Sequence, residues 1–121
     1  MLTGRAWLLV IAMLAMAAVL VASLLPGGLG WAPIRPPVLA HFVAYFALSA
    51  LMTLWLGGRL VQALAIALGL SILGLGIELV QIQIPKRSFL WLDGLFNFAG
   101  ALAGALSAVL FSATWRHRRD P

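Results

Sequence analysis

Residues 77–100 read IELVQIQIPKRSFLWLDGLFNFAG, two apolar runs separated by a short polar break. Pro85 ends the first run, because a proline ring removes a backbone hydrogen bond and clashes with the preceding helical turn. Glu78 lies inside the first run and Asp93 near the start of the second, and these are two of only three acidic residues in the chain. The stretch predicts two helices that meet at one end, each with an acid near that end.

The composition of the whole chain indicates a membrane protein. Hydrophobic residues make up 64% of the 121 residues and charged residues 9%, whereas soluble proteins have about 45–50% and about 25%. A soluble domain of this length cannot bury so much apolar surface, but a lipid bilayer can cover it. The absence of cysteine excludes a disulfide framework, a thiolate metal site and a cysteine nucleophile.

Four apolar segments are long enough to cross a bilayer as helices, which takes about 20 residues. They are predicted at about residues 7–25, 38–56, 60–84 and 90–115, separated by Pro/Gly-rich or basic sequence. The first segment is expected to stay as a helix, because its apolar run is longer than the 7–15 residues usual in a signal peptide. The predicted fold is a single all-α domain over residues 1–121, an integral membrane four-helix bundle.

Basic residues predict the orientation of this bundle. If the N-terminus is cytoplasmic, that side carries five basic residues: Arg5, Arg59, Arg116, Arg118 and Arg119. The other side then carries three: Arg35, Lys86 and Arg87. Because cytoplasmic loops are enriched in Lys and Arg, both termini are expected to face the cytoplasm, with the chain multi-pass in the membrane. The basic residues form no face interleaved with aromatic residues, so no nucleic-acid partner is expected.

In this topology the polar residues of three segments fall at the same depth. At about 1.5 Å per residue, His41, Tyr45, Glu78, Asp93 and Asn97 are all expected within about 10 Å of the outer end of the bundle. The inner half has almost nothing comparable. The sequence therefore predicts a polar cluster near the outer surface.

Helical phase indicates which faces pack together. Asp93, Asn97, Gly100 and Gly104 fall on one stripe of the fourth segment. A similar stripe on the third segment contains Ser71, Gly74, Glu78 and Gln81. Small residues allow helices in lipid to approach closely, so Gly100 and Gly104 are expected to pack against the face of the third segment that carries Gly74.

The order of these features resembles the VanZ-like family of bacterial membrane proteins. The resemblance runs over HFVAY at 41–45 and IELVQ at 77–81, and then over single positions. These positions are Pro85, Arg87, Asp93, Asn97, Gly100 and Gly104. Membership would imply a small four-helix plasma-membrane protein of the cell envelope, similar to accessory factors of glycopeptide resistance. Many relatives have Asp-Lys just before the histidine motif, where this chain has Pro37 and Val38.

Three kinds of function remain open from the sequence. In the first, the cluster binds an envelope component, such as a lipid-linked cell-wall precursor or a glycopeptide. In the second, Glu78, Asp93 and His41 are catalytic groups of an intramembrane acid/base enzyme. In the third, the acids are structural clasps without a ligand.

Further residues are assigned to the predicted site by their chemistry. The guanidinium of Arg87 suits a carboxylate or phosphate, and three more residues are candidates for contact with a ligand: Tyr45, Gln81 and Asn97. No cofactor and no metal are expected, because the region has one histidine and no pair of ligands at i, i+4 on one helix. A metal bound by His41, Glu78 and Asp93 is the least favoured alternative.

Overall fold

The computed structural model describes residues 3–25, 37–85 and 91–119. The described chain is all-helical: a short 3₁₀ turn, η1 (Thr3–Arg5), precedes α1 (Ala6–Leu24), α2 (Pro37–Leu56), α3 (Leu60–Gln81) and α4 (Trp91–Arg119). All four α-helices are long and apolar enough to cross a membrane. The prediction of four such helices is confirmed.

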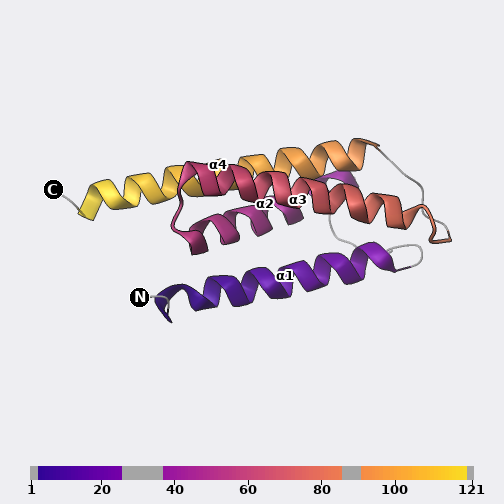
Figure 1. Cartoon of the computed structure of the whole chain (residues 1–121), viewed down its shortest axis with the longest axis horizontal. Helices are drawn as coiled ribbons and strands as arrows, with labels where there is room; N and C mark the ends of the chain where they lie inside the picture. The colour runs from indigo at the N-terminus through magenta and orange to yellow at the C-terminus, as the bar shows by residue number, and fades with distance from the viewer. Residues whose placement is uncertain (1–2, 26–36, 86–90, 120–121) are drawn as a thin grey trace.

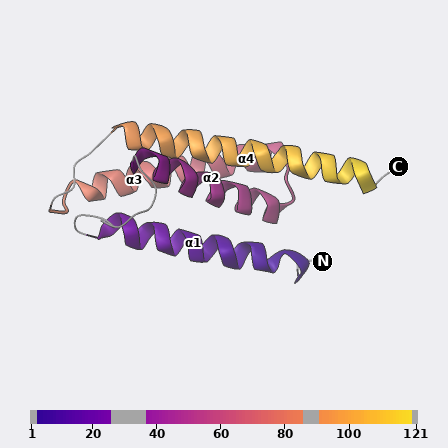
Figure 2. The ribbon, with the colours of Figure 1, turned by 180° about the vertical axis from the view of Figure 1, so that it is seen from behind.

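The helices alternate in direction along one long axis (Figure 1). The start of α1, the α2–α3 connection and the end of α4 lie at one end of the molecule, which we call the Gly57 end. The end of α1, the start of α2, the end of α3 and the start of α4 lie at the other, which we call the Asp93 end. Figure 2 shows the same arrangement from behind.

A glycine pair makes the tight turn between α2 and α3. Gly57 and Gly58 both have positive φ, 102° and 70°, a backbone conformation that costs little only for glycine. The N–H of Gly58 donates to the carbonyl of Thr53 (2.9 Å), and that of Gly57 to the carbonyl of Leu54 (3.1 Å). This is the Schellman arrangement, which satisfies the last carbonyl groups of α2 and reverses the chain.

The closest helix contact joins α2 and α4, which pack together more extensively than any other pair. A Cβ atom on Gly100 would overlap the carbonyl oxygen of Phe42, and one on Gly104 would overlap that of Phe46. The two glycines therefore bring the backbones of α2 and α4 into direct contact. The expectation that they pack against the Gly74 face of α3 is wrong. Helical phase shows which residues share one face of a helix, but it does not show which helix packs against that face.

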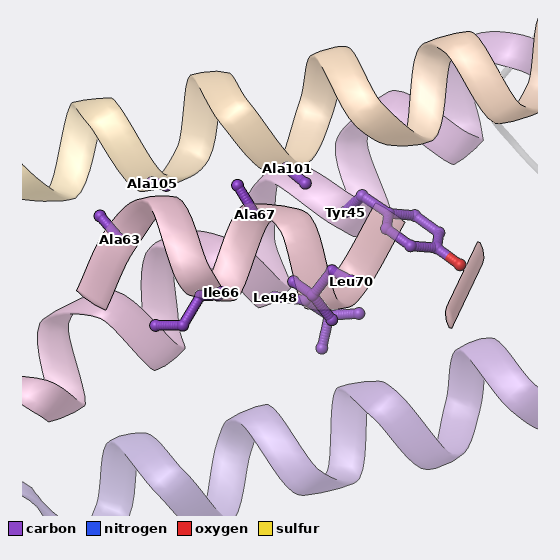
Figure 3. Packing of buried hydrophobic residues seen from close by; sticks show 8 residues of the cluster. All are labelled: Tyr45, Leu48, Ala63, Ile66, Ala67, Leu70, Ala101 and Ala105. Atoms are coloured by element: carbon purple, nitrogen blue, oxygen red, sulfur yellow. The ribbon is translucent and has the colours of Figure 1, made fainter. Parts of the chain in front are cut away.

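Alanines form the contact between α3 and α4. Ala63 and Ala67 of α3 and Ala101 and Ala105 of α4 are almost completely buried, and Figure 3 shows them along the sides of the two helices that face each other. Larger side chains, among them Leu48 and Leu70, complete this core (Figure 3). Small residues thus determine the spacing of all three helices, as is typical of helix packing in lipid.

Helix α1 lies to one side of this three-helix unit (Figures 1 and 2). It buries only Leu8 and Ala12 among its residues, and Ala15, Met16 and Val19 pack partly against the core. Its remaining large side chains are mostly exposed apolar groups, including Trp7, Val10, Met13, Leu14 and Val21. The helix contributes apolar surface and few interior contacts.

Two helix ends differ from the sequence prediction. Helix α3 ends at Gln81 rather than at residue 84, because Pro85 cannot accommodate a helical carbonyl at Gln81 and disfavours helical backbone at Ile84. The amides of Gln83 and Ile84 instead bond the carbonyls three residues earlier, each at 3.0 Å.

Helix α4 continues to Arg119 rather than ending at residue 115. Its last turn is basic, which suits the partial negative charge at a helix C-terminus. The Arg116 guanidinium donates to the Gly57 carbonyl at 3.0 Å, and that of Arg119 lies 5.0 Å from the centre of the Trp115 ring. The end of the apolar run in the sequence therefore marks the end of the segment that could cross a membrane, whereas the helix itself continues into the basic residues.

The α2–α4 contact predicts a strong effect of one added methyl group. Gly104→Ala should destabilise the purified protein by about 1–3 kcal/mol, because the α2 backbone has no room to accept the new Cβ. Thermal unfolding in detergent measures this. The matched control is Gly76→Ala on α3, where a Cβ would meet nothing within 4 Å, and which should leave the melting temperature unchanged or raise it. Equal melting temperatures for Gly104→Ala and the wild type would contradict the described packing.

Candidate functional site

Three helices bring polar side chains together at the Asp93 end. His41 lies one turn after the start of α2 at Pro37, and Glu78 lies one turn before the end of α3 at Gln81. Asp93 lies in the first turn of α4. Because α2 and α4 start at this end and α3 ends there, the alternating directions of the helices place all three residues in one layer.

His41 connects α2 to two residues of α4. Its Nδ1 lies 3.0 Å from Oδ1 of Asn97, a hydrogen bond between partly buried side chains. Its Nε2 lies 3.6 Å from Oδ2 of Asp93. Asn97 is one turn beyond Asp93 on α4, so one imidazole ring contacts two successive turns of that helix.

Glu78 approaches the same group from α3. One ligand-type atom from each of His41, Glu78 and Asp93 lies within 4.8 Å of the others. Glu78 is 1% exposed, whereas the side chains of His41 and Asp93 are 24% and 14% exposed. Asp93 is also at the N-terminus of a long helix, where the macrodipole favours a negative charge. The two carboxyl groups therefore have different surroundings, one enclosed by protein and one at the edge.

Tyr45 and Asn97 lie beside this group and are both buried. They fill the space that a side chain at position 74 would take: a Cβ on Gly74 would be 2.9 Å from Nδ2 of Asn97 and 3.0 Å from the hydroxyl oxygen of Tyr45. Gly74 is one turn before Glu78 on α3. Its missing side chain lets the polar ends of Tyr45 and Asn97 reach α3.

Gln81 has a structural contact that the sequence did not indicate. Its Nε2 donates to the carbonyl oxygen of Ser23 at 2.7 Å, and its side chain is buried. Ser23 is in the last turn of α1, where carbonyl groups have no partner within their own helix. Gln81, expected to contact a ligand, thus joins the end of α3 to the end of α1 through its amide nitrogen.

Arg87, the predicted anion-binding residue, lies outside the described residues. Pro85, two positions earlier, lies in the turn that follows α3. In the part of the chain that the structure describes, the arginines are Arg5 and Arg59, together with Arg116, Arg118 and Arg119. All of these belong to the segments that meet at the Gly57 end.

Two residues with buried hydroxyl groups, Ser49 and Thr53, are not among the residues predicted from the sequence. Ser49 and Thr53 are both 0% exposed and follow Tyr45 at successive four-residue steps along α2. Neither hydroxyl has a hydrogen-bond partner among the described residues. The face of α2 that begins with His41 and Tyr45 therefore stays small and polar toward the Gly57 end, and extending the i, i+4 spacing beyond Tyr45 would have found both residues.

Comparisons with known proteins assign no family to this chain. No protein-family model, no curated protein and no solved structure matches it.

The Gln81 contact predicts that α1 loosens when this amide is lost. Gln81→Leu should destabilise the protein by about 1 kcal/mol, because the Ser23 carbonyl loses its hydrogen bond. Backbone amide exchange should speed up in residues 20–25 and stay unchanged in α4. Gln83→Leu, at an exposed position, is the control and should change neither property. Unchanged exchange in α1 of Gln81→Leu would mean that other contacts hold this helix.

Proposed function

We propose that all four helices span a bacterial plasma membrane and that both termini face the cytoplasm. Large apolar side chains are exposed on every helix, for example Val10, Val43, Leu68 and Leu110. A soluble protein does not expose so many of them. Lipid covers such surfaces. The arginines at the Gly57 end support a cytoplasmic location of that end.

Tryptophan positions support a spanning arrangement. Trp7 and Trp115 are 58% and 49% exposed near the Gly57 end, and Trp91 is 70% exposed at the Asp93 end. Trp91 and Trp115 are 24 residues apart on α4, about 36 Å along a helix. This separation suits the two interfaces of a bilayer whose apolar core is about 30 Å thick, where tryptophan is enriched.

The proposed orientation can be tested with single cysteines, because the chain has none of its own. Gly4→Cys has open space around its Cβ, and Gln83→Cys is exposed at the opposite end. An impermeant maleimide applied to intact spheroplasts should label Gln83→Cys and should label Gly4→Cys only after permeabilisation. Labelling of Gly4→Cys in intact spheroplasts would overturn the orientation.

Within this membrane setting the chain is proposed to be a VanZ-like protein whose polar cluster binds a component of the cell envelope. The observation that carries the proposal is the convergence of His41, Glu78 and Asp93 from three helices at the end assigned to the outer surface. A charged acid in a spanning helix costs about 2.5–3.5 kcal/mol at the bilayer centre and less near its ends. Residues with this cost usually serve ions, protons or ligands.

A lipid-linked cell-wall precursor or a glycopeptide that targets one suits this place. Such ligands carry polar groups at the outer surface, where the partly exposed side chains of His41 and Asp93 are accessible. The resemblance to glycopeptide-resistance accessory proteins, through HFVAY at 41–45 and the residues from Ile77 to Gly104, points to the same ligands.

An acid/base enzyme acting on a lipid-linked precursor is the second candidate, and one observation favours it. The ring of His41 contacts Asp93 on one side and Asn97 on the other, an arrangement that orients an imidazole for proton transfer. Glu78 and Asp93 would then be two carboxyl groups with different environments and different roles.

Two isosteric variants separate a functional site from a structural clasp. Glu78→Gln and Asp93→Asn, expressed in a strain lacking the native chain, should reach wild-type abundance in the membrane and melt at or above the wild-type temperature. Both should lose the effect of the chain on glycopeptide susceptibility. Ser71→Ala is the control on α3, because Ser71 donates to the Ala67 carbonyl of its own helix; it should keep both properties.

The opposite result has a distinct pattern. A buried ion pair that loses one partner destabilises the fold by about 3–5 kcal/mol. If the acids were only clasps, abundance and phenotype would therefore fall together in Glu78→Gln and Asp93→Asn.

A further inference from the structure

The cluster at the Asp93 end contains a set of metal-ligand groups drawn from three different helices. His41 on α2, Glu78 on α3 and Asp93 on α4 each offer one atom, and these atoms lie within 4.8 Å of one another. Two ligand atoms on one tetrahedral metal ion are about 3.3–3.6 Å apart at bond lengths of 2.0–2.2 Å, and Nε2 of His41 already lies 3.6 Å from Oδ2 of Asp93. Movements of about 1 Å in the partly exposed side chains of His41 and Asp93 complete such a set.

Asn97 holds the ring of His41 in a tautomer that suits metal binding. Its Oδ1 lies 3.0 Å from Nδ1 of His41, and because an amide oxygen only accepts, Nδ1 carries the proton. In the neutral ring, Nε2 then has a lone pair on the side of Asp93, whose Oδ2 is 3.6 Å away. Histidines that bind metals typically donate their second ring N–H to an oxygen in this way, which sets the tautomer and the ring orientation.

Charge balance also favours a divalent cation. A divalent cation between two carboxyl groups neutralises their charge, which matters most where water is scarce, as around Glu78, which is 1% exposed. A 2+ ion with two carboxylates and a neutral imidazole makes a site with no net charge, which is the least costly state in an apolar bundle. One nitrogen and two oxygens suit zinc, manganese or iron(II), whereas calcium and magnesium prefer oxygen alone.

We propose that His41, Glu78 and Asp93 bind one divalent transition-metal ion, with Asn97 as the residue that positions His41. The site goes beyond the proposed function, because it requires neither an envelope ligand nor a particular orientation in the membrane. A metal here would join α2, α3 and α4 at the Asp93 end and would offer open coordination positions on the exposed side of Asp93 and His41.

Metal content of the purified full-length protein is the first measurement. Protein in detergent, stripped with a chelator and then dialysed against Zn²⁺ or Mn²⁺, should retain about one ion per chain by elemental analysis. Its melting temperature should rise with the concentration of free metal, because an ion that binds only the folded state stabilises it by mass action. Co²⁺ in place of Zn²⁺ should give visible d–d absorption that reports a mixed nitrogen and oxygen ligand set.

Variants identify the ligands. His41→Gln and Asp93→Asn should each lose the bound ion and the metal-dependent rise in melting temperature. His117→Gln removes the only other histidine of the chain, at an exposed position in the last turn of α4, and should bind metal like the wild type. Asn97→Leu should keep the stoichiometry but weaken affinity about 10–100-fold, as removal of a second partner of a ligating histidine does, with a shifted Co²⁺ spectrum.

Three outcomes would overturn the proposal. The first is a folded wild-type protein that retains no Zn²⁺, Mn²⁺ or Fe²⁺ and shows no metal-dependent melting. The second is binding that survives in both His41→Gln and Asp93→Asn. The third is binding lost only in His117→Gln. None of these depends on glycopeptide susceptibility, so the metal site and the proposed function can fail separately.

Discussion

The direct backbone contact between α2 and α4 is the constraint on which the other features depend. Gly100 and Gly104 leave no side chain between the two helices, so the carbonyl groups of Phe42 and Phe46 lie against the α4 backbone. Side chains elsewhere on a helix can adjust to a shift by rotating. Two backbones in direct contact cannot adjust in this way, so the contact fixes the axial position of one helix relative to the other. An axial shift of one residue would bring a larger side chain to the contact point, so the two helices hold each other in place lengthwise.

This register is what brings His41 to both Asp93 and Asn97. Gly100 is one turn beyond Asn97 on α4, and Phe42 is next to His41 on α2, so the close contact and the polar cluster are neighbours along the same interface. Helix α3 then adds Glu78, at a distance determined by Gly74 and by the alanines of α3 and α4. The polar groups are therefore held by small residues on three helices rather than by a loop, and sites on rigid elements keep their geometry best.

The sequence predicts most of this fold, because four long apolar runs with Pro/Gly breaks allow few arrangements of the helices. It also places His41, Glu78 and Asp93 in one layer, since depth follows from counting residues along a helix. It does not show which helix Gly100 and Gly104 contact, because helical phase identifies the face that they share but not the helix that packs against it. The role of Gln81 depends on where α1 docks, and no pattern within α3 carries that information. The sequence also gives little weight to a metal site at His41, Glu78 and Asp93, because these residues come from three helices and the spacing within one helix does not indicate that they converge.

The α2–α4 pairing also determines the order in which the bundle can assemble during synthesis. Helix α2 carries Ser49 and Thr53 on a completely buried face, but its main packing partner, α4, is made after α3. Until α4 leaves the ribosome, the polar side of α2 has no glycine face to pack against. Final packing of α2 is therefore a late step of assembly, and a nascent chain that stops before Trp91 leaves α2 without its main packing partner.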